Sequence, residues 1–154
     1  LQSYTANADS SVAIPMFVSA TYTEATLTAP LSGGGEGDIL AADEPGATIP
    51  YVPEWKFAVG AGLSAENWGL SAIVSYRSDM YASAKNLEVS NGREGKIDGG
   101  FILDLSAHYR LSDTTRLIGG VHNVLDEVLT VSRLPDGPRA NAPREFYIGF
   151  ELQW

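Results

Sequence analysis

The sequence predicts an all-β fold, an antiparallel transmembrane β-barrel, from three observations. Its clearest repeats have a period of two residues, which is the period of a strand. The repeating stretches reach about eleven residues, enough for a tilted strand to cross a bilayer, whereas strands in soluble proteins usually have about five or six. The connections alternate between short turns and long loops, as in barrels of the outer membrane.

We expect six strands, and each has its own alternation of apolar and polar residues. In the first, Ile14, Met16 and Val18 alternate with Phe17 and Ser19. The fifth, marked by Leu117, Val121 and Leu125, is the weakest. The expected strands are residues 12–28, 54–65, 68–82, 100–111, 115–125 and 144–154.

The other four strands alternate more regularly, with an apolar series on every second residue and Gly, Ser or charged residues between. The four apolar series are Phe57, Val59, Ala61 and Leu63; Trp68, Leu70, Ala72, Val74 and Tyr76; Phe101, Leu103, Leu105, Ala107, Tyr109 and Leu111; and Phe146, Ile148, Phe150, Leu152 and Trp154. Strict alternation of this kind indicates strands with two chemically different faces.

The turns fix how neighbouring strands pair. Residues 66–67 and 112–114 are the short turns, and 31–53, 83–99 and 126–143 are the long loops. A two-residue turn at 66–67 pairs Leu63 with Leu70 and Lys56 with Arg77, so apolar residues meet apolar residues. A three-residue turn at 112–114 pairs Tyr109 with Leu117 and sets Asp104 opposite His122, which again keeps the faces matched.

The placement of the aromatic residues indicates which face meets lipid. On the apolar face, Trp68, Tyr76, Tyr109 and Trp154 fall at strand ends, where rings gather at membrane interfaces. The opposite face is rich in Gly, Ser, Thr and charge, and it suits a water-filled or polar-plugged interior. The strand pattern alone also permits the inverted arrangement, a soluble barrel with its apolar face inside.

Composition narrows the function. The 154 residues allow one domain, and 10 Lys plus Arg against 19 Asp plus Glu give a net charge of −9, which argues against nucleic-acid binding. No run approaches the roughly 18 to 20 apolar residues of a membrane helix. With no cysteine, disulfides, thiolate metal sites and a Cys nucleophile are excluded.

Two segments carry a resemblance to a known family. The last residues, Tyr147 to Trp154, resemble the terminal signal read by the outer-membrane assembly machinery, with Tyr147, Gly149, Leu152 and Trp154 as its marked positions. The stretch from Gly120 to Glu127, followed by 135–139 and 142–146, resembles the closing segment of TonB-dependent outer-membrane receptors. Over residues 12–154 the sequence is similar to receptors of the ferric dicitrate (siderophore) type.

The resemblance implies a larger assembly than this chain. Such receptors are plugged barrels of 22 strands, so this chain is expected to be their C-terminal six or so strands, with the plug domain absent from it. The resemblance implies a bacterial outer-membrane location, with the C-terminus at the periplasmic side. It also implies TonB-dependent active import of a ferric siderophore or ferric citrate.

The expected partners and cofactors follow from the same resemblance. TonB would be contacted through the missing N-terminal part, and the other partners are outer-membrane lipid and the barrel assembly machinery. No covalent cofactor is expected, and the ferric chelate is the transported ligand. We expect no enzyme activity and no nucleic-acid partner.

Candidate site residues are few, and none is catalytic. Lys56 and Arg77 pair near the outer mouth on the polar face, and the loop that follows adds three cations. Like charges side by side cost energy unless an anion or acidic neighbours offset them. The candidate ligand-binding set is Lys56, Arg77, Lys85, Arg93 and Lys96. The competing interpretation is that Glu54 and Asp79 neutralise the first pair.

The two histidines, His108 and His122, are expected on the polar face, tying strands together by hydrogen bonds rather than holding a metal. Two other functions stay open. A soluble all-β binding module, lipocalin-like or a sandwich, would remain in buffer where a barrel segment needs detergent. A passive porin would lack a plug and a TonB-contacting segment.

Overall fold

The structure is a computed structural model that describes residues 2–4, 12–31, 38–42, 45–90, 92–135 and 137–153. The described residues form strands, and no helix among them is long and apolar enough to cross a membrane. One antiparallel sheet contains β1 (Gln2–Tyr4), β2 (Ile14–Tyr22), β3 (Trp55–Ser64), β4 (Trp68–Arg77), β7 (Gly100–Ser112), β8 (Thr115–His122) and β11 (Glu145–Leu152), in that order. The all-β antiparallel fold predicted from the sequence is confirmed.

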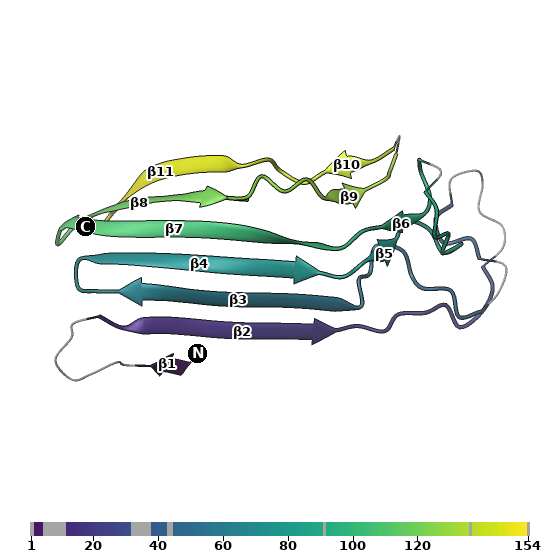
Figure 1. Cartoon of the computed structure of the whole chain (residues 1–154), viewed down its shortest axis with the longest axis horizontal. Helices are drawn as coiled ribbons and strands as arrows, with labels where there is room; N and C mark the ends of the chain where they lie inside the picture. The colour runs from purple at the N-terminus through teal and green to yellow at the C-terminus, as the bar shows by residue number, and fades with distance from the viewer. Residues whose placement is uncertain are drawn as a thin grey trace.

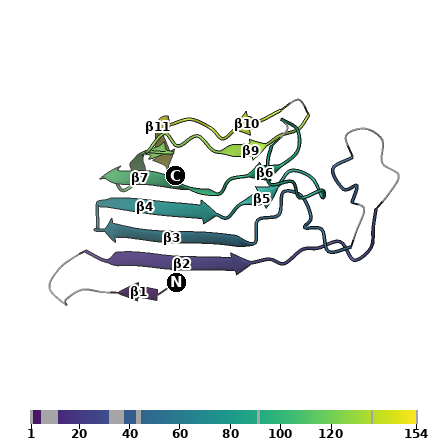
Figure 2. The same cartoon turned by 45° about the vertical axis from the view of Figure 1, so that its right-hand side comes forward.

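Two small sheets lie outside the main one, in the long loops. β5 (Met80–Tyr81) pairs with β6 (Lys96–Ile97), and β9 (Thr130–Ser132) pairs with β10 (Arg139–Ala140). In Figure 1 both small sheets lie at the right-hand end, and the short turns and the C-terminus lie at the left. After a 45° turn the two small sheets again lie at the right-hand ends of the long strands (Figure 2). The long loops therefore gather at one end of the sheet.

The register predicted for the hairpins is confirmed. Leu63 is opposite Leu70 and Lys56 is opposite Arg77, as the two-residue turn requires. In the second hairpin Tyr109 is opposite Leu117, but the turn differs from the prediction. Ser112 pairs with Thr115 after a shift between Arg110 and Ser112, so a bulge and a two-residue turn replace the predicted three-residue turn.

Several strand ends differ from the prediction, and the sheet has one more strand than the six expected. β1 is the additional strand and pairs with β2. The expected first strand, 12–28, ends at Tyr22, and the expected third, 68–82, ends at Arg77. Past Tyr22 the apolar positions shift to Ala25 and Leu27, on the other face, whereas past Arg77 the series continues with Met80 and Ala82. At both points the chain turns out of the main sheet into loop contacts. β8 ends before Asn123, whose φ of 50° is not extended.

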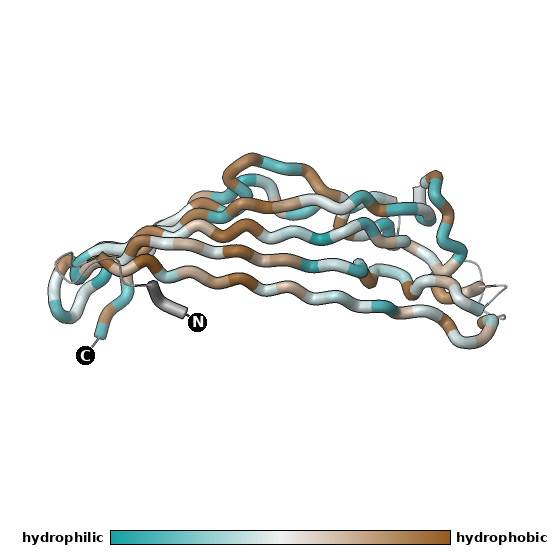
Figure 3. The backbone as a smooth tube through the Cα atoms, turned by 60° about the horizontal axis from the view of Figure 1, so that its bottom comes forward, coloured by the Kyte–Doolittle hydropathy of each residue, from teal (hydrophilic) through white to brown (hydrophobic). Residues whose placement is uncertain are grey.

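Apolar burial is confined to the loops among the described residues. The buried hydrophobic residues are Ala42, Met80, Ala82, Ala84 and Ile97, all outside the main sheet. Leu63, Leu70 and Leu105 are more than two-fifths exposed, and Phe150 is 66% exposed. Figure 3 shows hydrophobic segments recurring along the strands without a second layer covering them. The apolar face therefore does not close over a core of its own, contrary to the lipocalin-like or sandwich alternative.

Candidate functional site

Aromatic rings mark both ends of the exposed apolar face. At the loop end, Tyr22, Trp55 and Phe57 form a series of ring contacts that Tyr76 continues, with centroids 4.8, 5.3 and 5.8 Å apart. At the turn end, Trp68 lies opposite Tyr109 in the register of β4 and β7. The sequence argument used Trp68, Tyr76 and Tyr109, and all three lie at these ends. Trp154 lies outside the described residues.

The distance between the two groups of rings fits a bilayer. β3 runs from Trp55 to Ser64, and the next residue, Ala65, donates its backbone N–H to the carbonyl of Trp68. About ten steps of about 3.3 Å make about 33 Å along the strand, and a tilt of about 40° reduces this to about 25 Å across the membrane. An apolar band of about 25 Å between aromatic rings is typical of membrane barrels.

The opposite face has a different construction, with rings lying over glycines of the neighbouring strand. Phe17 is the register partner of Gly60, His108 of Gly69, and Tyr147 of Gly120. In each pair a Cβ added to the glycine would run into the partner's ring. Gly60 and Gly69 are therefore required by close approach of a ring, and Gly120 by the ring of Tyr147 together with the backbone carbonyl of Leu105. The sequence pattern did not indicate these requirements.

The histidines take structural positions on this second face. His122 Nδ1 lies 3.6 Å from Asp104 Oδ1, as the predicted pairing of these residues implies, and its ring stacks on Tyr147 at 5.1 Å. Within the described ranges, no three His, Asp or Glu side chains gather closely enough to hold a metal ion.

At the loop end, the structure places Lys56 directly opposite Arg77. Lys56 is exposed and forms no ion pair with any residue that the structure describes. Arg77 is partly buried, and its Nη2 donates to the carbonyl oxygen of Thr130 at 2.6 Å. The predicted pairing of Lys56 with Arg77 is confirmed, and Arg77 is also hydrogen-bonded to the last long loop.

Lys96 belongs to an ionic cluster with Asp79. Lys96 Nζ lies 2.9 Å from Asp79 Oδ2 and 3.7 Å from Glu88 Oε2, and the hydroxyl of Tyr81 donates to Glu88 Oε1 at 2.6 Å. Asp79 also accepts the N–H of Gly99 at 2.7 Å. Asp79 therefore accepts hydrogen bonds from Gly99 and Lys96, and its charge also acts on Arg77, as the competing interpretation expected, but it forms no ion pair with Lys56.

These contacts set the charges of the cluster. The Gly99 N–H, followed by Lys96, holds the pKa of Asp79 below its ordinary value. The hydrogen bond to Asp79 raises the pKa of Lys96. The hydrogen bond to Glu88 raises the pKa of Tyr81. At neutral pH the carboxylate and the ammonium are both charged and the phenol is neutral.

The remaining candidate cations lie in the same loop. Lys85 Nζ forms an ion pair with Glu94 Oε1 at 2.7 Å, and Arg93 is exposed beside Glu94 in the chain. The five predicted residues therefore share the loop end, and Lys56 is exposed there without an ion pair to any residue that the structure describes.

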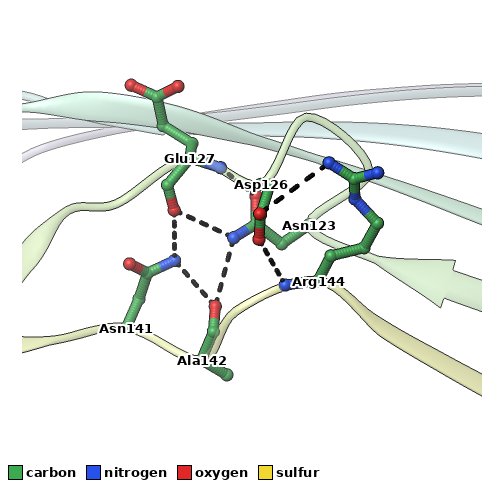
Figure 4. A network of polar contacts seen from close by, with 6 residues as sticks. All are labelled: Asn123, Asp126, Glu127, Asn141, Ala142 and Arg144. Atoms are coloured by element: carbon green, nitrogen blue, oxygen red, sulfur yellow. Dashed lines mark hydrogen bonds and ion pairs between the residues drawn. The ribbon is translucent and has the colours of Figure 1, made fainter.

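A polar network at the base of the last loop joins two segments that the sequence analysis singled out (Figure 4). The side chain of Asn123 donates to the carbonyls of Glu127 and Ala142 at 2.9 and 3.1 Å and accepts the N–H of Glu127 at 2.9 Å. The carboxylate of Asp126 accepts the N–H of Arg144 at 2.9 Å. We call this network the clasp. It holds the end of β8 against the entry to β11.

The segment expected to carry the assembly signal forms the edge strand that the clasp precedes. Tyr147, Gly149 and Leu152 lie in β11 and pair with Gly120, Ile118 and Thr115 of β8. The large apolar residues of β11 that face away from Tyr147, such as Phe146 and Ile148, are about three-quarters exposed. Their role as a signal remains a prediction.

The sequence matches the TonB dependent receptor-like, β-barrel family over residues 4–124. The chain belongs to this family. TonB-dependent receptor barrels are outer-membrane transport proteins rather than enzymes. A sequence search of curated proteins finds no match.

Solved structures of metal transporters and import receptors share the fold. The ferric citrate transporter FecA in its unliganded form superposes with a TM-score of 0.71 at 22% identity, over 92% of this chain and 21% of FecA. The ferric-catecholate import receptor Fiu of E. coli K12, in its closed form, gives 0.65 at 19% identity, over 90% and 18%. The copper transporter OprC gives 0.60 at 15%, over 97% and 22%. The chain thus spans about a fifth of these receptors.

Proposed function

We propose that this chain is the C-terminal barrel segment of an outer-membrane receptor that imports a ferric chelate, of the ferric citrate or ferric siderophore class, with energy from TonB. The observation that carries the proposal is the family match, which assigns the sheet to a transport barrel. FecA, the ferric citrate transporter, and Fiu, the ferric-catecholate receptor, have this fold. In the proposal the whole receptor has 22 strands and a plug, which other parts of its sequence supply.

The loop end supplies the candidate contacts for an anionic chelate. Lys56 is exposed, lies beside Arg77, and has no carboxylate within ion-pair distance among the described residues. Lys85, Arg93 and Lys96 lie in the loop that follows. Lys85 and Lys96 are already paired with acidic residues, so a chelate would have to compete with Glu94 and Asp79 for them. We therefore rank Lys56 first and Arg77 second.

The orientation is part of the same proposal. The long loops, with Lys56 at their base, face the outside, and the short turns and the end of β11 face the periplasm. Tyr147, Gly149, Leu152 and Trp154 serve as the signal for the barrel assembly machinery. Outer-membrane lipid contacts the face that carries Leu63, Leu70 and Phe150.

The test uses the whole receptor in bacterial cells, with radiolabelled ferric citrate and a ferric catecholate as probes. We expect saturable uptake of at least one probe, and loss of that uptake when TonB is deleted. Uptake that persists without TonB would indicate a passive pore. Uptake of copper complexes with neither ferric probe transported would overturn the ferric assignment.

The residue assignment has a separate test, the binding of the transported probe to the purified receptor. Because a hydrogen bond to a charged group is stronger than a neutral one, Lys56→Gln should weaken binding by about tenfold. Arg139→Gln removes another exposed cation, from the last loop, and should leave binding unchanged. Equal affinity of wild-type protein and Lys56→Gln would remove Lys56 from the site.

A further inference from the structure

Tyr51 links all three long loops, which comprise residues 23–54, 78–99 and 123–144. Its backbone N–H donates to the carbonyl of Tyr81 in the second loop at 2.9 Å. Its hydroxyl accepts the N–H of Arg133 in the third loop at 3.3 Å. Its side chain packs against the cluster of Met80, Ala82 and Ile97. One residue of the first loop therefore contacts both of the others.

Arg133 completes the connection from the opposite side. Its Nη2 donates to the carbonyl of Lys96 at 3.1 Å, which ties the third loop to β6 in the second. The neighbouring bond from Arg77 Nη2 to Thr130 ties the third loop to the end of β4 as well. The third loop is thus fixed to the second loop and to the main sheet through two guanidinium groups.

Asn86 provides an independent link between the first two loops. Its side chain accepts the N–H of Thr48 at 2.7 Å and donates to the carbonyl of the same residue at 3.2 Å. Two residues earlier, the N–H of Ala84 donates to the carbonyl of Ile39 at 2.7 Å. Ala82, Ile97 and Ala84 are almost completely buried, so apolar packing accompanies these bonds.

We propose that the described residues of the three loops form one body, the loop block, with Tyr51 and Arg133 as its positioning residues. The contacts join residues that are 37, 38 and 82 positions apart, and each loop bonds to both of the others. A segment held in this way opens as one cooperative unit. The loop block is a preformed wall beside Lys56 and Arg77, and one of its loops cannot close over a ligand without breaking it.

Hydrogen exchange in the whole receptor without ligand tests this inference. The probes are the amides of Tyr51, Ala82 and Asn141, one in each loop, whose N–H groups donate to the carbonyls of Tyr81, Gly95 and Leu129. Arg133→Met removes the side-chain hydrogen bond to the carbonyl of Lys96. In this variant the exchange rate of all three amides should rise by about tenfold. Tyr51→Phe removes only the hydroxyl acceptor and should give a smaller rise at the same three sites.

Arg139→Met is the matched control, because Arg139 is an exposed arginine of the same loop, and it should change none of the three amides. Heat-modifiable gel mobility reports whether each variant has a folded barrel. If Arg133→Met does not fold, the pattern in Tyr51→Phe decides. A rise confined to residues 123–144 would show that the loops open separately and would overturn the loop block. Since no ligand is present, this result is independent of the proposed import.

Discussion

The main sheet and the loop block place their apolar side chains in opposite ways. The sheet exposes its large apolar residues, with Leu70 at 52% and Phe150 at 66%. The loop block buries Ile97 and Ala82 completely. In the proposed receptor the apolar face of the sheet meets lipid, so it needs no protein layer to cover it. The loops lie beyond the rings of Tyr22 and Trp55, in water, and must build a core of their own.

The surrounding medium therefore determines where this chain buries its apolar side chains. In lipid, side-chain alternation and backbone pairing are sufficient for a strand, because the bilayer removes its apolar face from water. In water, a loop of the same chain is ordered only when apolar burial and hydrogen bonds offset its conformational entropy. Substitutions should therefore act by different rules in the two regions.

Truncating the loop core should have the largest effect, and a local one. Ile97→Ala removes a completely buried side chain beside Met80 and Ala82, and such truncations cost about 2–5 kcal/mol. We expect faster hydrogen exchange throughout the loop block with unchanged unfolding of the barrel strands. Val89→Ala, in the same loop at 82% exposure, should change little. Unfolding of the strands together with the loops would mean that the two regions share one core.

A charge on the lipid face should have the next largest effect. Ala72 lies midway between Trp68 and Tyr76 on β4, so Ala72→Arg places a guanidinium near the bilayer midplane at a cost of about 2–4 kcal/mol. Denaturant unfolding in lipid vesicles measures the loss. Ser75→Arg, on the opposite face of the same strand, is the control and should cost much less. Equal costs would contradict the assignment of the faces.

Filling a glycine position on the polar face should cost about 1–3 kcal/mol, because overpacking strains the neighbouring side chain. In Gly60→Ala the new Cβ would meet the ring of Phe17. The cost should shrink when Phe17→Ala is introduced as well, which a double-mutant cycle of unfolding free energies measures. Additive costs would show that the ring and the glycine are not coupled.

Lowering the pH should have the smallest effect on stability, and this effect should be confined to the loop block. The pKa of Asp79 is lowered in the folded state, so its stabilisation is complete above the unfolded value of about 3.9 and is lost as pH falls through the folded pKa. Exchange at the Ala82 amide should therefore rise below about pH 4 in wild-type protein. In Asp79→Asn this rise should be weaker, whereas Asp98→Asn, an exposed residue of the same loop, should retain it.

The sequence predicted the membrane strands better than the loops, for a physical reason. The pairing of Leu63 with Leu70 follows from a period of two and a short turn, which are local signals. The contact between Tyr51 and Arg133 joins residues 82 positions apart, and no local pattern indicates it. The end of β4 was placed too late because Met80 and Tyr81 are extended, although they pair with β6 instead.

In the candidate site, too, contacts set by local register were predictable and contacts within the loops were not. The juxtaposition of Lys56 and Arg77 was predictable because register alone determines it. The partners of Lys96 were not, since Asp79 reaches them only after the chain leaves the main sheet. The glycines beside Phe17, His108 and Tyr147 were not predictable, because each pair joins strands connected by a long loop, whose register no short turn determines.

The clasp closes the last loop at its base, between Asn123 and Ala142 and between Asp126 and Arg144. The start of β11 is therefore set by these bonds and not by the number of residues between them. Lengthening the chain at Gly137, near the tip and beyond Arg133, leaves both anchor points in place. This loop is consequently a suitable position for grafting a foreign peptide, such as an affinity tag, without shifting the alignment of the final strand.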